Sequence, residues 1–338
     1  MQDWDYHKKQ FIKLGGLIEN LTCREGSNGR GMFREGRDCT PKILCPGHLL
    51  VKTEDASLIA GKFCLNESSE HSPEAREFIE NYYQNFSWGE SGKKETAKFT
   101  EEIFQMPQKA KSLLLNSSLC SDNILNCEPS LQRAFQRFIR SRAINYKGKS
   151  VLAPIWELVN HSPFERPFKT SKNGVETPAY QKNPTTHEIF HPYKKDASPL
   201  SIFFNYGFAS NEPLAYSLPV KIQLSDRSLT ITIKGMQRGI RMTKKSILYS
   251  KSTLSIPALP LGSISSELPT TFFYSIIQMH GMRKEKASNL IHKLQLANLD
   301  QRKKLKDHLR IDQSETAKSL IKSIDREISL IEGSLKIT

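Results

Sequence analysis

The chain of 338 residues is long enough for one large domain or two ordinary ones, each with a sizeable core. Hydrophobic residues make up 38% and aromatic residues 9% of it, which excludes a largely disordered chain. The formal net charge of +14 favours an acidic partner, such as nucleic acid or an acidic protein. Because the basic residues are spread along the chain, a basic soluble enzyme without a polyanion partner is an equal alternative.

The cysteines and the N-terminus indicate the compartment. None of the six cysteines forms a Cys-x-x-Cys pair, so we expect no zinc knuckle. The first residues are polar, and no apolar run approaches the roughly 20 residues that a membrane span needs. We therefore expect reduced thiols, no membrane association and a cytoplasmic location, with the nucleus as the alternative.

A glycine-rich segment, residues 26–31, leads into Met32 and Phe33. Glycine tolerates positive φ and lets the backbone come close to a ligand. Neither the Gly-x-Gly-x-x-Gly spacing of dinucleotide sites nor the Gly-Lys-Ser/Thr of a P-loop is present. The residues alone therefore favour a plain turn.

Short strands are predicted at residues 43–44 and 49–51, after which the composition changes. Ser72 followed by Pro73 is a signal for the start of a helix. Apolar residues then fall on one helical face, namely Ala75, Phe78, Ile79, Tyr82 and Phe86.

Two more helical runs follow a polar stretch at residues 87–98, one near 103–115 and one at 129–142. The last is amphipathic, with arginines expected outside (Arg133, Arg137 and Arg140) and an inward face of Leu131, Ala134, Phe135, Phe138 and Ile139. We therefore predict a mostly helical insertion between two β-rich pieces.

Two apolar runs, Val151–Ser162 and Ile202–Gly207, resemble strands and stop on small polar clusters. The clusters are Asn160-His161-Ser162 and Asn205-Tyr206-Gly207. Polar groups at the end of a buried strand are held rigidly, and chemistry is often sited there. We predict that the two ends converge on one site.

A polar loop at residues 163–198 separates these runs and contains His187-Glu-Ile-Phe-His191, a zinc-peptidase pattern. That pattern works only on a helix, where residues four apart share a face. Pro192 follows the second histidine directly and disfavours a helix there. We therefore expect no metal site.

The C-terminal third begins with a predicted hairpin, Val220–Leu224 and Leu229–Ile233, around a four-residue loop. A proline-rich connector at 256–269 leads to a helix over residues 283–310. Asp312 and Glu315 resemble a capping box before a second helix. The two helices are expected to pack as an antiparallel pair through apolar stripes, the second being Ala317, Leu320, Ile321, Ile324, Ile328, Ile331 and Leu335.

The order of short motifs from about Trp4 to Val220 resembles that of SET-domain protein methyltransferases. Within them it is similar to the group of the Rubisco large-subunit lysine methyltransferase and the actin histidine methyltransferase. The motifs are the N-terminal tryptophan, the Gly29-Arg30-Gly31 loop, the helical insertion, Ser141-Arg142-Ala143, Pro154 with Asn160-His161-Ser162, and Tyr206-Gly207 with Ser210-Asn211-Glu212.

The resemblance implies an α+β fold, with a β-rich SET core, an inserted helical segment and a C-terminal helical domain. Residues 1–66 would be the N-terminal part of the core and residues 67–146 the insertion. Residues 147–219 would complete the core with the cofactor and catalytic motifs. Residues 220–338 would add the hairpin and a helical domain for substrate docking, with 268–335 as the docking surface.

The resemblance also implies roles for single residues toward S-adenosylmethionine. The backbone of Asn28-Gly29-Arg30-Gly31 would hold its methionine portion, and Arg142 would face its carboxylate. Asn160 and His161 would hold its adenine and amino group. The remaining two positions are tyrosines, a second cofactor contact at Tyr216 and the catalytic tyrosine of the methyl-transfer channel at Tyr206.

The implied activity is S-adenosylmethionine-dependent methylation of a protein, with lysine preferred to histidine as acceptor and no metal required. We expect a monomer that binds a protein substrate, acidic or not, and nucleic acid is not required as a partner. Departures from the family pattern at Arg34, Asp196–Pro199 and Ser217-Leu218 point to an altered substrate or lost activity. The rival hypothesis is therefore a catalytically inactive SET-like module that binds an acidic protein or nucleic acid.

Overall fold

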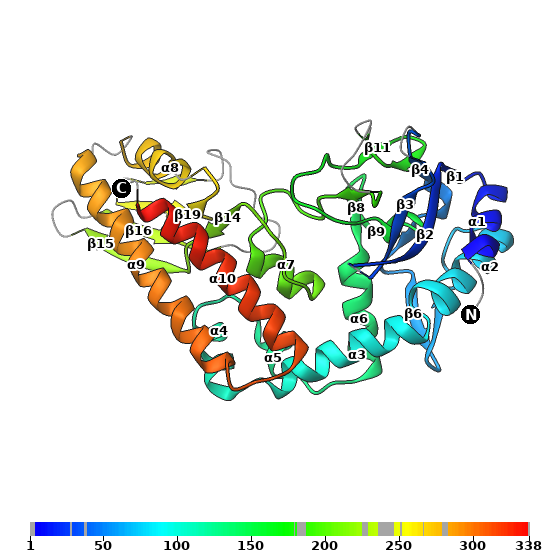
Figure 1. Ribbon diagram of the computed structural model, residues 1–338, viewed down its shortest axis with the longest axis horizontal. Coiled ribbons are helices and arrows are strands. Elements are labelled where there is room, and N and C mark those ends of the chain that lie inside the picture. The colour runs from blue at the N-terminus through cyan, green and yellow to red at the C-terminus, as the bar shows by residue number, and fades with distance from the viewer. Residues whose placement is uncertain are drawn as a thin grey trace. The chain divides into compact units, whose positions relative to one another are not determined.

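The computed structural model of the protein describes residues 4–27, 29–36, 39–178, 180, 187–224, 229–235, 247–250, 252–265, 267–278 and 283–336. Its elements are a mixture of helices and strands with a helical C-terminal region, as predicted (Figure 1). The chain forms two compact units, Met1–Thr100 with Pro129–Lys195, and Glu101–Glu128 with Asp196–Thr338. No helix among the described residues is both long and apolar enough to cross a membrane.

In its described residues, the first unit combines short sheets with three helices and part of a fourth. Its helical elements are α1 (Trp4–Lys13), the 3₁₀ turn η1 (Gly47–Leu49), α2 (Pro73–Tyr82), the π-helical turn η2 (Tyr83–Ser87), α6 (Leu131–Arg142) and the 3₁₀ turn η3 (Trp156–Leu158). Its strands are β1 (Leu17–Glu19), β2 (Leu21–Gly26), β3 (Gly29–Arg34), β4 (Lys42–Pro46), β5 (Val51–Lys52), β6 (Ala56–Ile59), β7 (Lys62–Leu65), β8 (Ile144–Tyr146), β9 (Lys149–Leu152), β10 (Asn160–His161), β11 (Lys169–Ser171), β12 (Gly174–Glu176) and β13 (Phe190–His191). Helix α3 (Glu90–Gln105) runs from the first unit into the second.

These strands pair both as local hairpins and across long stretches of the chain, as between β4 and β12 and between β5 and β9. The largest sheet of this unit has the order β1-β4-β12-β11, and a second has the order β5-β9-β8. Hairpins β2-β3 and β6-β7 stand beside them, and β10 pairs with β13 in parallel. The β11-β12 hairpin and β13 lie within residues 163–198, so the prediction of a loop over that whole segment is wrong.

Helix α2 begins where the sequence predicts. The Ser72 side chain accepts a hydrogen bond from the Ala75 amide, and Pro73 occupies the first turn. The five residues predicted on its inner face, Phe86 included, are all buried, and they join an aromatic cluster around Tyr83, Trp88 and Phe138.

Two details of the helical segment differ from prediction. Residues 87–98 belong mostly to α3, because lysine, glutamate and alanine favour a helix even without an apolar stripe. Helix α6 is confirmed, with Ser130 as its N-cap, but Leu131 is 43% exposed. This leucine is the first residue of the helix and precedes the turn that enters the core.

The second unit is built from helices packed on two sheets. Its helices are α4 (Gln108–Asn116), α5 (Asp122–Leu125), α7 (Pro199–Tyr206), α8 (Leu268–Ile277), α9 (Lys284–Leu309) and α10 (Glu315–Leu335). Its strands are β14 (Leu214–Tyr216), β15 (Val220–Leu224), β16 (Leu229–Ile233), β17 (Leu248–Tyr249), β18 (Thr253–Ile256) and β19 (Pro260–Ser263).

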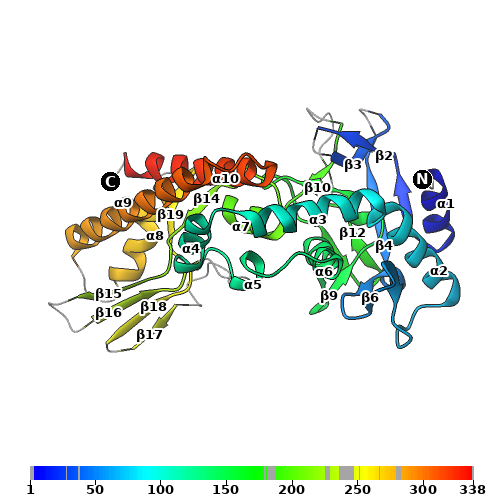
Figure 2. The same cartoon turned by 90° about the horizontal axis from the view of Figure 1, so that it is seen from below.

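The predicted hairpin is confirmed as β15-β16, which pairs Val220 with Ile233; its loop, 225–228, lies outside the described residues. It extends into a sheet of order β15-β16-β18-β17, seen in Figure 2. Strands β14 and β19 pair separately, and α10 packs against both.

The antiparallel helix pair is confirmed as α9 and α10, which lie side by side in Figure 1. The capping box at Asp312 is wrong, because Ser314 is the N-cap and accepts from the Ala317 amide at 3.1 Å. Asp312 instead accepts from the Ser314 amide at 2.9 Å, in a turn before the helix.

The strand predicted at Ile202–Gly207 is wrong, because these residues form helix α7 and its C-cap. Ser198 and Ser201 exchange side-chain-to-amide hydrogen bonds in a capping box, with Pro199 between them. Gly207 ends the helix at φ 92°, a left-handed conformation that favours glycine. These local signals and packing against α10 outweigh the strand propensity of the Ile-Phe-Phe run.

The run Val151–Ser162 is not one strand either. Strand β9 ends at Leu152, and Pro154 precedes a 3₁₀ turn, where Ile155 has φ 65°. The chain resumes extended backbone only at β10, so Asn160 and His161 form a separate two-residue strand.

Candidate functional site

The glycine-rich segment is a tight hairpin between β2 and β3. Gly26 pairs with Gly29 at its end, and Gly29 has φ 82°. Asn28, a predicted site residue, lies outside the described residues. Apart from its chain neighbours, a Cβ built on Gly29 would meet no atom of the described residues within 4 Å, so a ligand could approach this backbone closely.

The side chain of Asn160, in β10, contacts strand β3, which follows this turn. Its amide nitrogen donates to the Arg30 carbonyl at 3.2 Å and to Glu188 Oε1 at 2.6 Å. A Cβ on Gly31 would lie 2.7 Å from that nitrogen and 2.5 Å from the Glu188 oxygen, so only glycine fits there without a shift. The structure therefore brings Asn160 next to Arg30 and Gly31 on the strand that begins at Gly29.

The Arg30 side chain has a structural role. Its guanidinium donates to the Phe86 carbonyl at 2.6 Å and lies 4.6 Å from the centre of the Phe86 ring. It also pairs with Glu25 at 3.7 Å. These contacts fix the hairpin to η2. Because the guanidinium is engaged in them, a ligand would contact the backbone of Arg30 and not its charged group.

The His187-Glu-Ile-Phe-His191 motif is extended, not helical. The Arg34 amide donates to the His187 carbonyl at 2.8 Å, and the Ile189 amide donates to the Met32 carbonyl at 2.9 Å. Because residues 187–189 continue the sheet beside β3, the helix that the zinc pattern needs does not form. The motif instead supplies Glu188 to the Asn160 contact, a role that sequence analysis missed.

His161 is held by its neighbour across the β10-β13 pair. Its Nδ1 accepts from the Tyr193 amide at 3.0 Å, and the two rings lie 5.0 Å apart. An accepting Nδ1 places the proton of the neutral ring on Nε2. His161 therefore has a defined tautomer next to Asn160.

A second polar cluster of the first unit surrounds Glu157. Its carboxylate accepts from Tyr82 at 3.2 Å, from Tyr83 at 3.4 Å and from Ser87. Burial raises the pKa of Glu157, although the charge of Arg142 and the three hydroxyls oppose that rise. The sequence analysis missed this residue, whose signal was a single carboxylate within the apolar run 151–159.

Arg142, the predicted carboxylate partner, lies beside this cluster at the end of α6. Its guanidinium stacks 4.2 Å from the centre of the Phe138 ring, and Nη1 donates to Ser141 at 3.2 Å. Its Nε and Nη2 form no hydrogen bond to any of the described residues. Neighbouring residues link the two clusters, because Phe86 binds Arg30 and Ser87 binds Glu157.

The predicted tyrosines belong to the second unit. Tyr206 is the last residue of α7, and its ring lies 6.3 Å from that of Phe208. Tyr216 in β14 is buried, and its hydroxyl donates to the Asp196 carbonyl at 3.0 Å. Burial raises the pKa of Tyr216 above its ordinary range. Convergence of Tyr206 with Asn160 and His161 stays a prediction.

Two departures from the family pattern have structural partners. Arg34 is buried, with its guanidinium 5.7 Å from the Tyr180 ring centre and Nη1 donating to the Cys39 carbonyl at 3.4 Å. The Ser217 amide donates to the Leu259 carbonyl, and the Leu218 amide donates to Asn298 at 2.9 Å. Both departures are thus part of the packed structure.

Two buried histidines of the first unit predict a loss of stability in acid. Burial lowers the pKa of His7 to about 4 and that of His191 to about 3, so both are neutral when folded. The unfolded chain takes up their protons as the pH falls below about 6.5. Each neutral histidine therefore contributes fully to the free energy of unfolding above that pH. Below it the contribution declines, by about 2 kcal/mol for each histidine at pH 5.

The check is denaturant unfolding at pH 7.5 and pH 5. We expect His7→Phe, which keeps a ring next to Tyr82 and Phe86, to lose part of this pH dependence. His292→Gln on the exposed side of α9 is the control and should retain it. Equal pH dependence in His7→Phe and the unmutated protein would contradict the prediction.

Comparisons with known proteins give matches among solved structures alone. No protein-family model and no curated protein matches the sequence. The chain is similar to the SET domain of LSMT bound to lysine and AdoHcy, at 13% identity and a TM-score of 0.44, covering 99% of this chain and 90% of that one. It is also similar to Rubisco LSMT bound to AdoMet, at 14% identity and a TM-score of 0.45, covering 99% of this chain and 91% of that one. A third similar structure is Rubisco LSMT bound to sinefungin and monomethyllysine, at 14% identity and a TM-score of 0.42, covering 100% of this chain and 91% of that one.

Proposed function

We propose that the chain is an S-adenosylmethionine-dependent protein methyltransferase whose acceptor is a lysine side chain. The observation that supports this most is the hydrogen bond from Asn160 to the Arg30 carbonyl. It joins two motifs that are 130 positions apart in sequence, as expected if both serve one ligand.

The free hydrogen-bonding groups of the first unit fit an amino-acid moiety such as that of the cofactor. The Asn160 Oδ1 has no hydrogen-bond donor among the described residues, and it suits an ammonium group. The Nε and Nη2 of Arg142, which have no hydrogen-bond partner in the part of the chain that the structure describes, form the fork that suits a carboxylate. The backbone at Gly29, two residues before Gly31 on the same strand, is open to solvent or ligand.

When bound, S-adenosylmethionine supplies a methyl group on a cationic sulfonium. The task of the chain is to align a neutral amine with that methyl in a dry channel. A free lysine has a pKa of about 10.4, which burial next to a cation lowers. The Tyr206 hydroxyl would orient the amine by a hydrogen bond, without acting as a strong base.

The test is calorimetric titration with S-adenosylmethionine, followed by transfer of a labelled methyl group to proteins of a cell lysate. We expect saturable binding at one site and label on lysine, identified by mass spectrometry of the modified peptide. Label on histidine would keep the reaction and change the acceptor. No binding and no transfer would refute the proposal.

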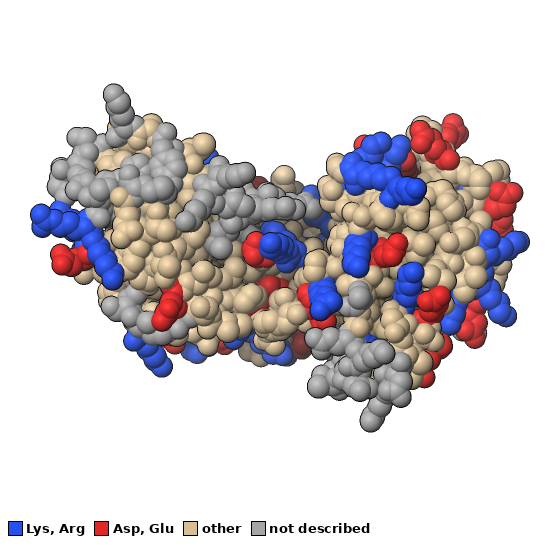
Figure 3. Space-filling model, turned by 90° about the horizontal axis from the view of Figure 1, so that it is seen from above, with Lys and Arg blue, Asp and Glu red and all other residues tan. Residues whose placement is uncertain are grey.

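The charge distribution argues against the rival hypothesis, a SET-like module that binds a polyanion. On the face shown in Figure 3, basic side chains of the first unit are interspersed with acidic ones. Ion pairs of this unit include Lys8 with Glu35 and Arg76 with Glu80, both at 3.4 Å. A polyanion interface requires a continuous basic surface instead, and binding to it would weaken steeply with salt.

A further inference from the structure

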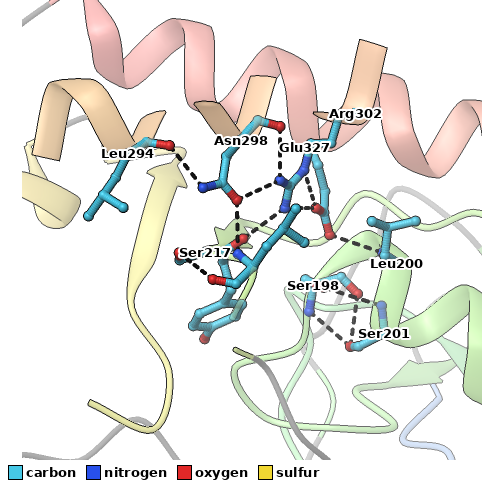
Figure 4. A network of polar contacts seen from close by, with 10 residues as sticks. Ser198, Leu200, Ser201, Ser217, Leu294, Asn298, Arg302 and Glu327 are labelled. Carbon is cyan, nitrogen blue, oxygen red and sulfur yellow. Dashed lines mark hydrogen bonds and ion pairs between the residues drawn. The ribbon is translucent and has the colours of Figure 1, made fainter. Parts of the chain in front are cut away.

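A fully buried ion pair joins the two long helices of the second unit. Arg302 of α9 donates through Nε and Nη2 to Glu327 Oε2 of α10, at 2.8 and 2.6 Å (Figure 4). Each side chain is 1% exposed. Such a pair contributes little net stability compared with apolar residues of the same size. Its other hydrogen bonds therefore indicate its role.

The pair binds the backbone of both segments that carry the predicted tyrosines. Arg302 Nη2 donates to the Tyr216 carbonyl at 2.7 Å. Glu327 Oε1 accepts from the Leu200 amide in the first turn of α7, at 3.2 Å. Figure 4 shows these contacts converging from the two long helices onto β14 and α7.

The Leu200 contact ties the first turn of α7 to α10. Amides of the first helical turn have no partner within the helix, and a carboxylate is favourable at that end. Helix α7 has eight residues and ends at Tyr206, closed by the Gly207 amide on the Phe203 carbonyl at 2.8 Å. Since Leu200 and Tyr206 belong to the same short capped helix, we expect a shift at Leu200 to move the Tyr206 ring.

Three further hydrogen bonds belong to the network. Asn298 Oδ1 accepts from Arg302 Nη1 at 3.0 Å and from the Leu218 amide at 2.9 Å. The Tyr216 hydroxyl donates to the Asp196 carbonyl, two residues before the N-cap of α7. Backbone and side chain of Tyr216 are therefore both fixed relative to the start of α7.

We propose that Arg302 and Glu327 are positioning residues for methyl transfer, which set the orientation of Tyr206 and Tyr216 through the backbone contacts above. This inference rests on the proposed function. It gives α9 and α10 a role in catalysis in addition to docking of the substrate.

The test uses the full chain and separates positioning from stability. Glu327→Gln keeps an acceptor for Leu200 but removes the charge that faces Arg302. The double variant Arg302→Met with Glu327→Met replaces the pair by apolar residues of similar size, a change that folded proteins often tolerate. Leu320→Ala, two turns before Glu327 and buried in α10, is the control that loosens packing without removing a network residue.

Rates are measured at a temperature at which circular dichroism shows every variant folded. We expect kcat to fall at least tenfold in Glu327→Gln and in the double variant, with the KM for S-adenosylmethionine within twofold. Leu320→Ala should keep kcat within twofold while its melting temperature falls. If the network variants have the kcat of Leu320→Ala, the positioning role is wrong. If the unmutated protein transfers no methyl group, the proposed function itself is wrong and the inference falls with it.

Discussion

Replacing Tyr206 by Phe is expected to slow methyl transfer about 100-fold or more, with the affinity for S-adenosylmethionine within about twofold. Phenylalanine keeps the ring next to Phe208 and the last turn of α7, and it removes only the hydroxyl. Without that hydroxyl, the acceptor amine loses the hydrogen bond that would orient it. Single-turnover transfer of labelled methyl, together with calorimetry, measures both quantities.

Tyr6→Phe is the matched control, because it makes the same chemical change on α1, outside the proposed site. Its transfer rate should equal that of the unmutated protein. A normal rate in Tyr206→Phe would remove this tyrosine from the mechanism. If neither protein transfers methyl and both bind polyanions with a steep salt dependence, the inactive-module hypothesis takes its place.

Sequence patterns predicted the elements whose signals are local. Ser72 before Pro73 marked the start of α2, and the alternation around residues 225–228 predicted β15 and β16. The apolar stripes of α9 and α10 predicted their packing, because a stripe of that length has to be buried. Each of these predictions needed only the neighbours along the chain.

The failures occurred where local signals conflicted or partners were distant. At Ile202–Phe204 the residue types favour a strand, yet the flanking serine box and Gly207 select a helix. Strands β10 and β13 have two residues each and pair across about thirty positions, too short for a periodicity to register. Their pairing follows from tertiary packing.

The candidate site was predicted in part for the same reason. Motif order indicated Asn160 and Arg142 as candidates but did not show what they contact. In the sequence, Glu188 was part of a metal-binding pattern only, whereas in the structure its carboxylate accepts a hydrogen bond from Asn160. Glu157 carried no motif, and its three hydroxyl partners come from α2 and η2, about seventy positions earlier. Contacts over such distances are determined by the fold as a whole.

Replacing Gly31 by Ala is expected to weaken S-adenosylmethionine binding about tenfold or more, a loss of ~1.4 kcal/mol. The added methyl carbon would lie 2.5 Å from Glu188 Oε1 and 2.7 Å from Asn160 Nδ2, so both side chains have to move. Asn160 then loses its bond to the Arg30 carbonyl, and with it the position of the acceptor oxygen that would face the cofactor.

Gly148→Ala is the matched control for that change. Gly148 has φ 81° in the turn between β8 and β9, and a Cβ there meets no described atom within 4 Å other than those of its chain neighbours. Alanine therefore strains the backbone by about 1 kcal/mol without touching Asn160 or Glu188. We expect the control to lose stability and keep its affinity, and Gly31→Ala to lose affinity. Titration calorimetry and thermal unfolding of both variants measure this contrast. Unchanged affinity in Gly31→Ala would show that the Asn160 contact does not shape the cofactor site.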